Sequence, residues 1–202
     1  AKYDANTLDL IVGNDKWAHD QVDVIGLFLY IVADLDFKNI RIIREGSDDI
    51  NVLKLLIYYL RSIEYWDRHD NGIWEECKLS HSSSIGSIVA GLSYIKRQRL
   101  FDVPDPLIDF GLDKFRWLRP FESRFCDPGS CVLCDGHQEK IRHHNHDCDA
   151  SQLTLIWPYH MIVTPQEQDS ILSRIIEGHL AENNEHHRLV QKHGLNRYWG
   201  DN

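Results

Sequence analysis

Apolar residues recur along this chain at the three- and four-residue spacing of an α-helix. The pattern predicts two helices in the first third of the sequence, one over about 20–36 and one that follows Asp48 and Asp49. Both aspartates suit a helix N-terminus, by capping and by their charge. The apolar stripes of these helices are Ile25, Phe28, Leu29 and Val32 in the first, and Ile50, Leu53, Leu56, Ile57, Leu60 and Ile63 in the second.

The same spacing predicts two more helices after a polar turn at 67–72. The run 82–84 consists of three serines, which offer N-caps for the third helix. Pro104 and Pro106 flank the start of the fourth helix, and Pro120 is expected to stop it. The inward positions are Ile85, Ile88, Val89, Leu92 and Ile95 in the third helix, and Ile108, Leu112 and Phe115 in the fourth.

Helical patterning resumes near the end of the chain. A short helix is expected at about 149–157, and Thr164, Pro165 and Glu167 form a capping box for a helix that reaches about 181. The tail, 182–202, is polar and irregular, and is expected to hold a short strand or a docked loop. Because the alternation of β-branched residues is scarce, we predict an all-α fold of paired helices.

Composition narrows the class of protein. The 202 residues suit one domain or part of a larger one. A net charge of −9 and a pI of about 5.7 argue against nucleic-acid and anionic-membrane partners. The longest apolar run, from Val24 to Ala33, is far shorter than the roughly 20 residues of a membrane span. We expect a soluble, cytoplasmic protein, and the initial Ala1 favours a chain that begins within a longer one.

The first candidate for chemistry is the segment 71–76, Asn-Gly-Ile-Trp-Glu-Glu. Glu75 and Glu76 diverge, so one can act on a leaving group while the other binds hydroxyls. An apolar ring such as Trp74 beside a carboxyl raises the pKa that a general acid needs. The alternative is that both acids are solvated loop residues and that Trp74 is a core residue.

The second candidate is the segment 17–23, at the start of the first predicted helix. It combines Trp17, His19, Gln21 and two acids, a set that can bind a neutral polyhydroxylated ligand by stacking and hydrogen bonding. The alternative is an ordinary capped helix with a satisfied histidine.

Together these segments resemble the family 15 glycoside hydrolases, the glucoamylase-like enzymes. The pattern is also shared with the non-enzymatic relatives in phosphorylase kinase α and β subunits. The resemblance covers about 2–202, apart from 121–148. The matching motifs are Trp17-x-x-x-Gln21-x-Asp23, Gly72-Ile73-Trp74-Glu75-Glu76, Ser83-Ser84, Ala90-Gly91-Leu92, Leu118-Arg119-Pro120, Asp149-Ala150-x-x-Leu153-x-x-Ile156-x-Pro158 and Asn196-Arg197-Tyr198-x-Gly200-Asp201.

The resemblance implies an (α/α)6 toroid with a pocket at one end, and hydrolysis that inverts the anomeric centre of an α-linked glucoside. By position, Glu75 matches the general acid, and its neighbour Glu76 matches a substrate-binding residue. Trp17 matches a residue that lines the pocket, and Trp74 and Asp23 would help to hold the sugar. His19 stands where many glucoamylases carry a substrate-binding Arg. No cofactor is required for this chemistry.

The chain also departs from the family pattern. An inverting glycosidase needs two carboxyls roughly 6.5–9.5 Å apart. By resemblance, the family's early Arg-Asp segment would precede Ala1 and its general base would follow Asn202. The pattern predicts about six helices, so the toroid would be incomplete. The chain is then either a piece of a longer protein or a shortened, non-catalytic relative, and flanking segments or a second copy could complete the pocket.

Residues 121–148 interrupt the helical pattern with a Cys/His-rich insert within the single domain 1–202. Thiolate and imidazole ligands favour zinc, which could staple a loop of low apolar content. Free thiols, or one disulfide, are the alternatives. An odd total of five Cys argues against a complete disulfide framework and favours a reducing compartment. The candidate ligands are Cys126, Cys131, Cys134, His146 and Cys148.

Three functions follow from these observations. The leading hypothesis is a glucoamylase-like hydrolase of α-glucosides or oligosaccharides. The first alternative is a non-catalytic carbohydrate-binding or regulatory domain of the same fold. The weakest is a zinc-stapled interaction domain.

Overall fold

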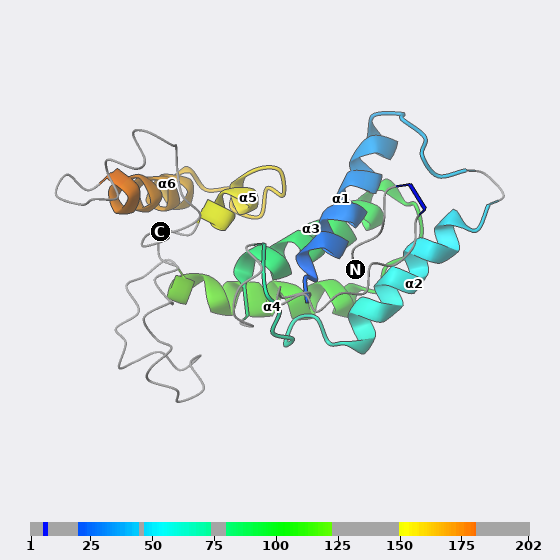
Figure 1. The fold of residues 1–202 in the computed structure, drawn as a ribbon, viewed down its shortest axis with the longest axis horizontal. Helices are drawn as coiled ribbons and strands as arrows, with labels where there is room; N and C mark the ends of the chain where they lie inside the picture. The colour runs from blue at the N-terminus through cyan, green and yellow to red at the C-terminus, as the bar shows by residue number, and fades with distance from the viewer. Residues whose placement is uncertain (1–5, 8–19, 45–46, 74–79, 123–149, 181–202) are drawn as a thin grey trace.

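The computed structural model of the chain describes residues 6–7, 20–44, 47–73, 80–122 and 150–180. Within these ranges the regular structure is helical and no strand is present, which confirms the all-α prediction (Figure 1). No helix among them is long and apolar enough to cross a membrane. The elements are α1 (Asp23–Phe37), α2 (Asp49–Ser62), α3 (Ser82–Gln98), α4 (Asp105–Glu122), the 3-10 helix η3 (Ala150–Gln152), α5 (Leu153–Ile156) and α6 (Pro165–Leu180).

Helix α3 lies at the centre of the fold and packs against α1 on one side and α4 on another (Figure 1). Every residue from Ser82 to Leu92 is buried. Close contact with α1 depends on two glycines. A Cβ on Gly91 would lie 2.6 Å from the carbonyl oxygen of Gly26, and a Cβ on Gly26 would lie 2.5 Å from the backbone nitrogen of Ile88.

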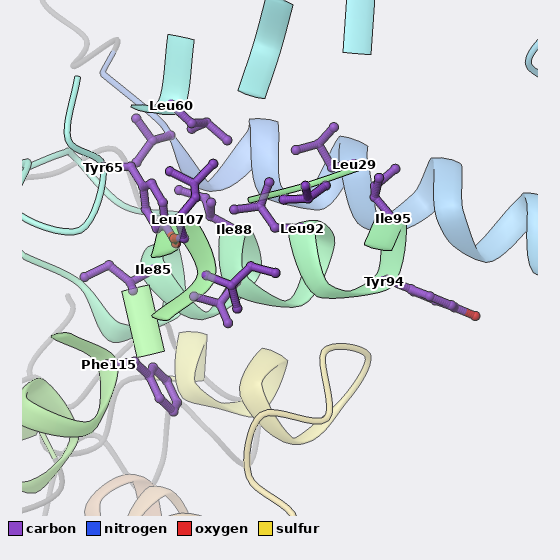
Figure 2. Packing of buried hydrophobic residues seen from close by; sticks show 14 of the residues in the cluster. Leu29, Leu60, Tyr65, Ile85, Ile88, Leu92, Tyr94, Ile95, Leu107 and Phe115 are labelled. Atoms are coloured by element: carbon purple, nitrogen blue, oxygen red, sulfur yellow. The ribbon is translucent and has the colours of Figure 1, made fainter. Parts of the chain in front are cut away.

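All the predicted inward residues of α3 and α4 belong to the hydrophobic core except Leu112, which is partly buried and packs against it (Figure 2). The stripe of α2 is confirmed at Leu53, Ile57 and Leu60, which are all buried. The predicted apolar stripe of α1 is wrong at Phe28, which was expected to face the core and is 45% exposed. The small residues of α1 allow its backbone to approach α3, so this face is buried and Phe28 turns outward. The buried residues of α1 are Gly26, Leu29, Val32 and Ala33.

The helix ends differ from the prediction at three places. The N-cap of α3 is His81, and the three serines lie buried in the first turn instead. Asp48 makes no capping hydrogen bond through its side chain, which instead accepts from Asn51. Helix α4 continues through Pro120 to Glu122. Because Pro120 lies in the last turn of the helix, its missing N–H affects only the end of the hydrogen-bond pattern.

Helix α6 begins at Pro165 as predicted, but the predicted capping box is wrong, because neither the Thr164 nor the Glu167 side chain bonds to the other residue's backbone N–H. The backbone N–H of Glu167 donates to the carbonyl oxygen of Thr164 at 3.2 Å. The Thr164 hydroxyl donates to Glu167 Oε2 at 2.7 Å, so the two side chains also bond to each other. The predicted tail, 182–202, and residues 123–148 of the predicted insert lie outside the described residues.

Candidate functional site

The two segments singled out in the sequence meet at the N-terminal ends of α1 and α3. The backbone N–H of Asn71 donates to the carbonyl oxygen of Asp20 at 2.7 Å, and the N–H of Asp20 donates to Asn71 Oδ1 at 3.1 Å. Gln21 adds a hydrogen bond from Nε2 to the carbonyl oxygen of Gly72 at 3.3 Å. The described ends of both segments therefore lie side by side, although they are 51 residues apart in the sequence.

Asp70 is the most deeply buried acid of this region, with 1% exposure. Its Oδ2 accepts a hydrogen bond from the N–H of Val22 at 3.3 Å and another from the hydroxyl of Ser84 at 2.9 Å. Burial raises the pKa of Asp70 to about 7. The hydrogen bond from Ser84 opposes this rise, whereas the charge of Asp23 adds to it.

Asp20 is engaged by a guanidinium. Arg68 Nη2 lies 2.7 Å from Asp20 Oδ2, and Arg68 Nε donates to Asp20 Oδ1 at 3.3 Å. The pair is partly buried, with 34% of the Arg68 side chain and 16% of the Asp20 side chain exposed. The two-point contact fixes the orientation of both side chains.

The loop turns at Gly72, which has a φ of +60°. A Cβ at this position would lie 2.9 Å from His81 Cδ2, so both the backbone conformation and the space require glycine. The His81 ring therefore packs against the turn that leads into the Trp-Glu-Glu motif.

Of the predicted binding residues, Asp20, Gln21 and Asp23 lie within the described part of the chain, and for Asp23 the family resemblance implies a role in holding the sugar. Asp23 begins α1, and its carbonyl oxygen accepts a hydrogen bond from the Ser87 hydroxyl at 3.2 Å. Trp17, His19, Trp74, Glu75 and Glu76 lie outside the described residues, so their roles stay predictions. In the described ranges no group of three or more His, Cys, Asp or Glu could hold a metal ion. The predicted zinc ligands, Cys126, Cys131, Cys134, His146 and Cys148, also lie outside these ranges.

Sequence reasoning missed the structural roles of Asp70, Arg68 and Ser84. It treated 67–72 only as a polar turn and the serines only as caps. The available signal was an acid, Asp70, directly before Asn71-Gly72, followed by the polar serine run at the start of the next helix. An acid beside a turn is usually solvated, so this signal is weak without the fold.

The chain belongs to the Glycosyl hydrolases family 15, whose family model matches residues 1–193. This confirms the resemblance seen in the sequence.

The relatives that match are named as regulatory subunits of phosphorylase b kinase. The liver isoform of the alpha subunit from Takifugu rubripes is 31% identical over 108 residues, covering 50% of this chain and 8% of the relative. The skeletal muscle isoform from Oryctolagus cuniculus is 29% identical over 110 residues, covering 51% of this chain and 9% of the relative. The probable alpha subunit from Caenorhabditis elegans is 24% identical over 209 residues, covering 100% of this chain and 15% of the relative.

The chain thus spans between 8% and 15% of the length of these three relatives. No solved structure matches the chain.

Proposed function

We propose that this chain forms part of a non-catalytic carbohydrate-binding or regulatory domain with the family 15 fold. The observation that carries the proposal is that the chain belongs to the Glycosyl hydrolases family 15, whereas the relatives described above are named as regulatory subunits. The expected ligand is an α-linked glucose oligosaccharide, because the sugar-binding segments of the family pattern are retained in the sequence.

Two acids near the meeting point of the segments, Asp70 and Asp20, are not candidates for a general base. A general base must reach a water molecule beside the sugar. Asp70 is 1% exposed and accepts hydrogen bonds from Val22 and Ser84, and Asp20 is held by Arg68. Both side chains therefore hold the two segments together instead of facing a substrate.

The second candidate is an inverting glucoamylase-like hydrolase. In this proposal Glu75 protonates the glycosidic oxygen, an activated water attacks the anomeric carbon, and Glu76, Trp17 and Asp23 hold the sugar. Family membership and the juxtaposition of the 20–23 and 70–72 segments favour it. A complete (α/α)6 toroid, with its base, would then require residues outside this chain or from a second copy.

Two measurements on the 202-residue chain separate these candidates. Calorimetric titration with maltohexaose tests binding, and NMR detection of released glucose and its anomer tests turnover. Each is repeated with Glu75→Gln and with the control Asp109→Asn, an exposed acid on α4. Saturable binding without glucose release, in all three proteins, is the result expected of a binding domain.

Release of β-glucose that disappears only in Glu75→Gln would overturn the proposal and establish the hydrolase. Absence of both binding and release would exclude a carbohydrate function for these residues.

A structural zinc in the Cys/His-rich insert remains a separate proposal. Thiolate ligands and the low apolar content of the insert support it. Native mass spectrometry of the purified chain would show about 65 Da of added mass per bound zinc ion, and its absence after zinc supplementation would leave free thiols or one disulfide as the explanation.

A further inference from the structure

Three aromatic side chains and an ion pair lie together on the surface formed by α4 and the segment that follows α2. The Trp66 and Phe110 rings have centroids 5.0 Å apart and are tilted by 40°. Lys114 Nζ lies 2.7 Å from Asp67 Oδ1 and 5.0 Å from the centroid of the Trp117 ring. Because Phe110, Lys114 and Trp117 are spaced four and three residues apart on α4, they share one face of that helix. We call these five residues the aromatic platform.

The platform is open to solvent and firmly based. Phe110 is 52% exposed and Trp117 is 44% exposed, although large apolar side chains are usually buried. Trp66 is partly buried and packs against the hydrophobic core, and its ring centroid lies 5.4 Å from that of the buried Tyr65. The base of the platform is therefore ordered before a ligand arrives, so stacking on it requires little ordering of side chains.

The charges around the platform favour a neutral ligand. The Asp67 side chain is 67% exposed, and Asp109 and Asp113 are exposed acids on α4. The two cations among them, Lys114 and Arg116, are paired with Asp67 and Asp113. Nucleic-acid bases also stack on aromatic rings, but their phosphates would meet more negative than positive charge among these residues.

The ion pair within the platform also argues against a protein partner. Charged residues are depleted from the core of protein–protein interfaces, where they would lose their hydration. Lys114 lies one helical turn from both Phe110 and Trp117, so a partner that covered the rings would bury the ion pair as well. A sugar can use both parts, because its C–H faces stack on rings while its hydroxyls bond to a carboxylate acceptor and an ammonium donor.

The spacing of the rings fits a chain of sugars. Trp117 follows Phe110 by seven residues, which is roughly 10 Å along a helix. That distance exceeds one sugar ring, so the two side chains would stack on different units of an oligosaccharide.

We propose that the aromatic platform is a second binding surface for an α-linked glucose oligosaccharide, in addition to the segments 17–23 and 71–76. Phe110 and Trp117 stack on sugar rings, and Trp66 supports Phe110. Asp67 accepts hydrogen bonds from hydroxyls, and Lys114 donates to them. The inference rests on the proposed function for the class of its ligand, but it uses none of the residues proposed to hold the sugar there.

An NMR titration of the 202-residue chain with maltohexaose, read at the tryptophan indole N–H signals, tests the platform. Trp66→Phe and Trp117→Phe assign its two signals, and we expect both to shift and to saturate. Phe110→Ala should weaken the affinity read at Trp117 about tenfold, the scale of one lost stacking contact. Tyr58→Ala, which removes a 64% exposed ring from α2, is the control and should leave that affinity unchanged. Equal affinities in all these chains would overturn the inference.

Asp67→Asn tests the polar part of the platform without removing an apolar contact. The neutral amide is a weaker acceptor than the carboxylate, so the affinity read at Trp117 should fall several-fold. Asp113→Asn, which breaks the exposed ion pair with Arg116 on the same helix, is the matched control and should have no effect. Because the ligand is neutral, the wild-type affinity should not depend on salt, and a steep fall with salt would contradict stacking as its source.

The other tryptophans separate this inference from the proposed function. Signals of Trp17 and Trp74 report on the two motif segments. Shifts there without shifts at Trp66 and Trp117 would support the proposed function and overturn the platform. Shifts at Trp66 and Trp117 alone would support the platform and count against binding at the motif segments. Platform signals that change with protein concentration in the absence of sugar would assign the surface to contact between copies of the chain, and would overturn the inference.

Discussion

The hydroxyl of Tyr65 fills the space in which a side chain at Gly111 would begin. A Cβ on Gly111 would lie 2.1 Å from Tyr65 Oη. The same hydroxyl donates to the carbonyl oxygen of Leu107 at 2.9 Å, and Tyr65 is fully buried beside Leu107 (Figure 2). The ring thus fastens the segment after α2 to the first turns of α4.

Tyr65→Phe should lower the free energy of unfolding by about 1 kcal/mol, because a buried hydrogen bond is lost. Urea denaturation followed by circular dichroism measures the change. Tyr58→Phe, at a position that is 64% exposed on α2, is the matched control and should change it by less than about 0.5 kcal/mol. Equal effects of the two substitutions would show that the Leu107 contact contributes nothing.

Gly111→Ala should cost roughly 3 kcal/mol, since the new methyl group meets both Tyr65 Oη and a methyl of Val89, which would lie 2.6 Å away. In the Tyr65→Phe background the cost should fall by about 1 kcal/mol, because the closest contact is gone. A double-mutant cycle with urea denaturation measures this coupling. Strict additivity would mean that the backbone of α4 shifts and that the hydroxyl does not limit the space.

A second prediction about packing concerns the close contact between α1 and α3. Gly91→Ala would place a methyl group 2.6 Å from the backbone oxygen of Gly26, which cannot move without moving α1. We expect a loss of about 3 kcal/mol, even though alanine favours a helix over glycine by about 1 kcal/mol. Ser93→Ala, at an exposed position of the same helix, is the control and should be neutral or slightly stabilising. A Gly91→Ala chain as stable as wild type would show that α1 can move outward at little cost.

The helices themselves could be predicted because apolar residues recur in each of them at the three- and four-residue spacing of an α-helix. Leu53, Ile57 and Leu60 are spaced so that only one face of α2 can be buried, and the structure buries it. Phe28 was misplaced because α1 is apolar around most of its circumference. For such a helix periodicity cannot choose the face, and the choice falls to Gly26 and Ala33, whose small size permits close backbone contact.

The junction at Asp70 could not be predicted in the same way. It depends on contacts between residues 48 to 51 positions apart, which no local pattern records. The resemblance to a family brought the 17–23 and 72–76 segments into one hypothesis. Only the fold shows that Asp20 and Asp70 serve the junction between them.

The start of α6 should respond to acid. The Thr164 hydroxyl, and after it the Arg119 guanidinium 3.0 Å from Glu167 Oε1, hold the pKa of Glu167 below its usual value. A lowered pKa stabilises the fold above the unfolded-state pKa, and that stability is lost as the pH falls. Glu167→Gln should therefore cost about 0.5 kcal/mol at pH 7, a small value because the pair is partly exposed.

The difference between wild type and Glu167→Gln should shrink as the pH falls below about 4.3, where a free glutamate is half protonated. Urea denaturation at pH 7, 5 and 3.5 measures it. Asp169→Asn, at an exposed position on the same helix, provides the control. A difference that grew in acid would contradict the ion pair as its source.

Asn71 gives the most direct test that the two motif segments depend on each other. Its side chain is 5% exposed and accepts the N–H of Asp20 at 3.1 Å. Asn71→Ala leaves that partly buried N–H without this acceptor, so we expect a loss of about 1 kcal/mol in unfolding free energy. Asn51→Ala removes an amide that donates to Asp48 on the exposed surface of α2, and it should change the stability by less than about 0.5 kcal/mol.

If maltohexaose binds the chain, Asn71→Ala should also weaken that binding while Asn51→Ala leaves it unchanged, because only the first substitution loosens the segments that lead to Trp17 and Trp74. Full stability in Asn71→Ala would mean that the remaining bonds between Gln21 and Gly72, and between Asn71 N–H and Asp20, suffice to hold the junction.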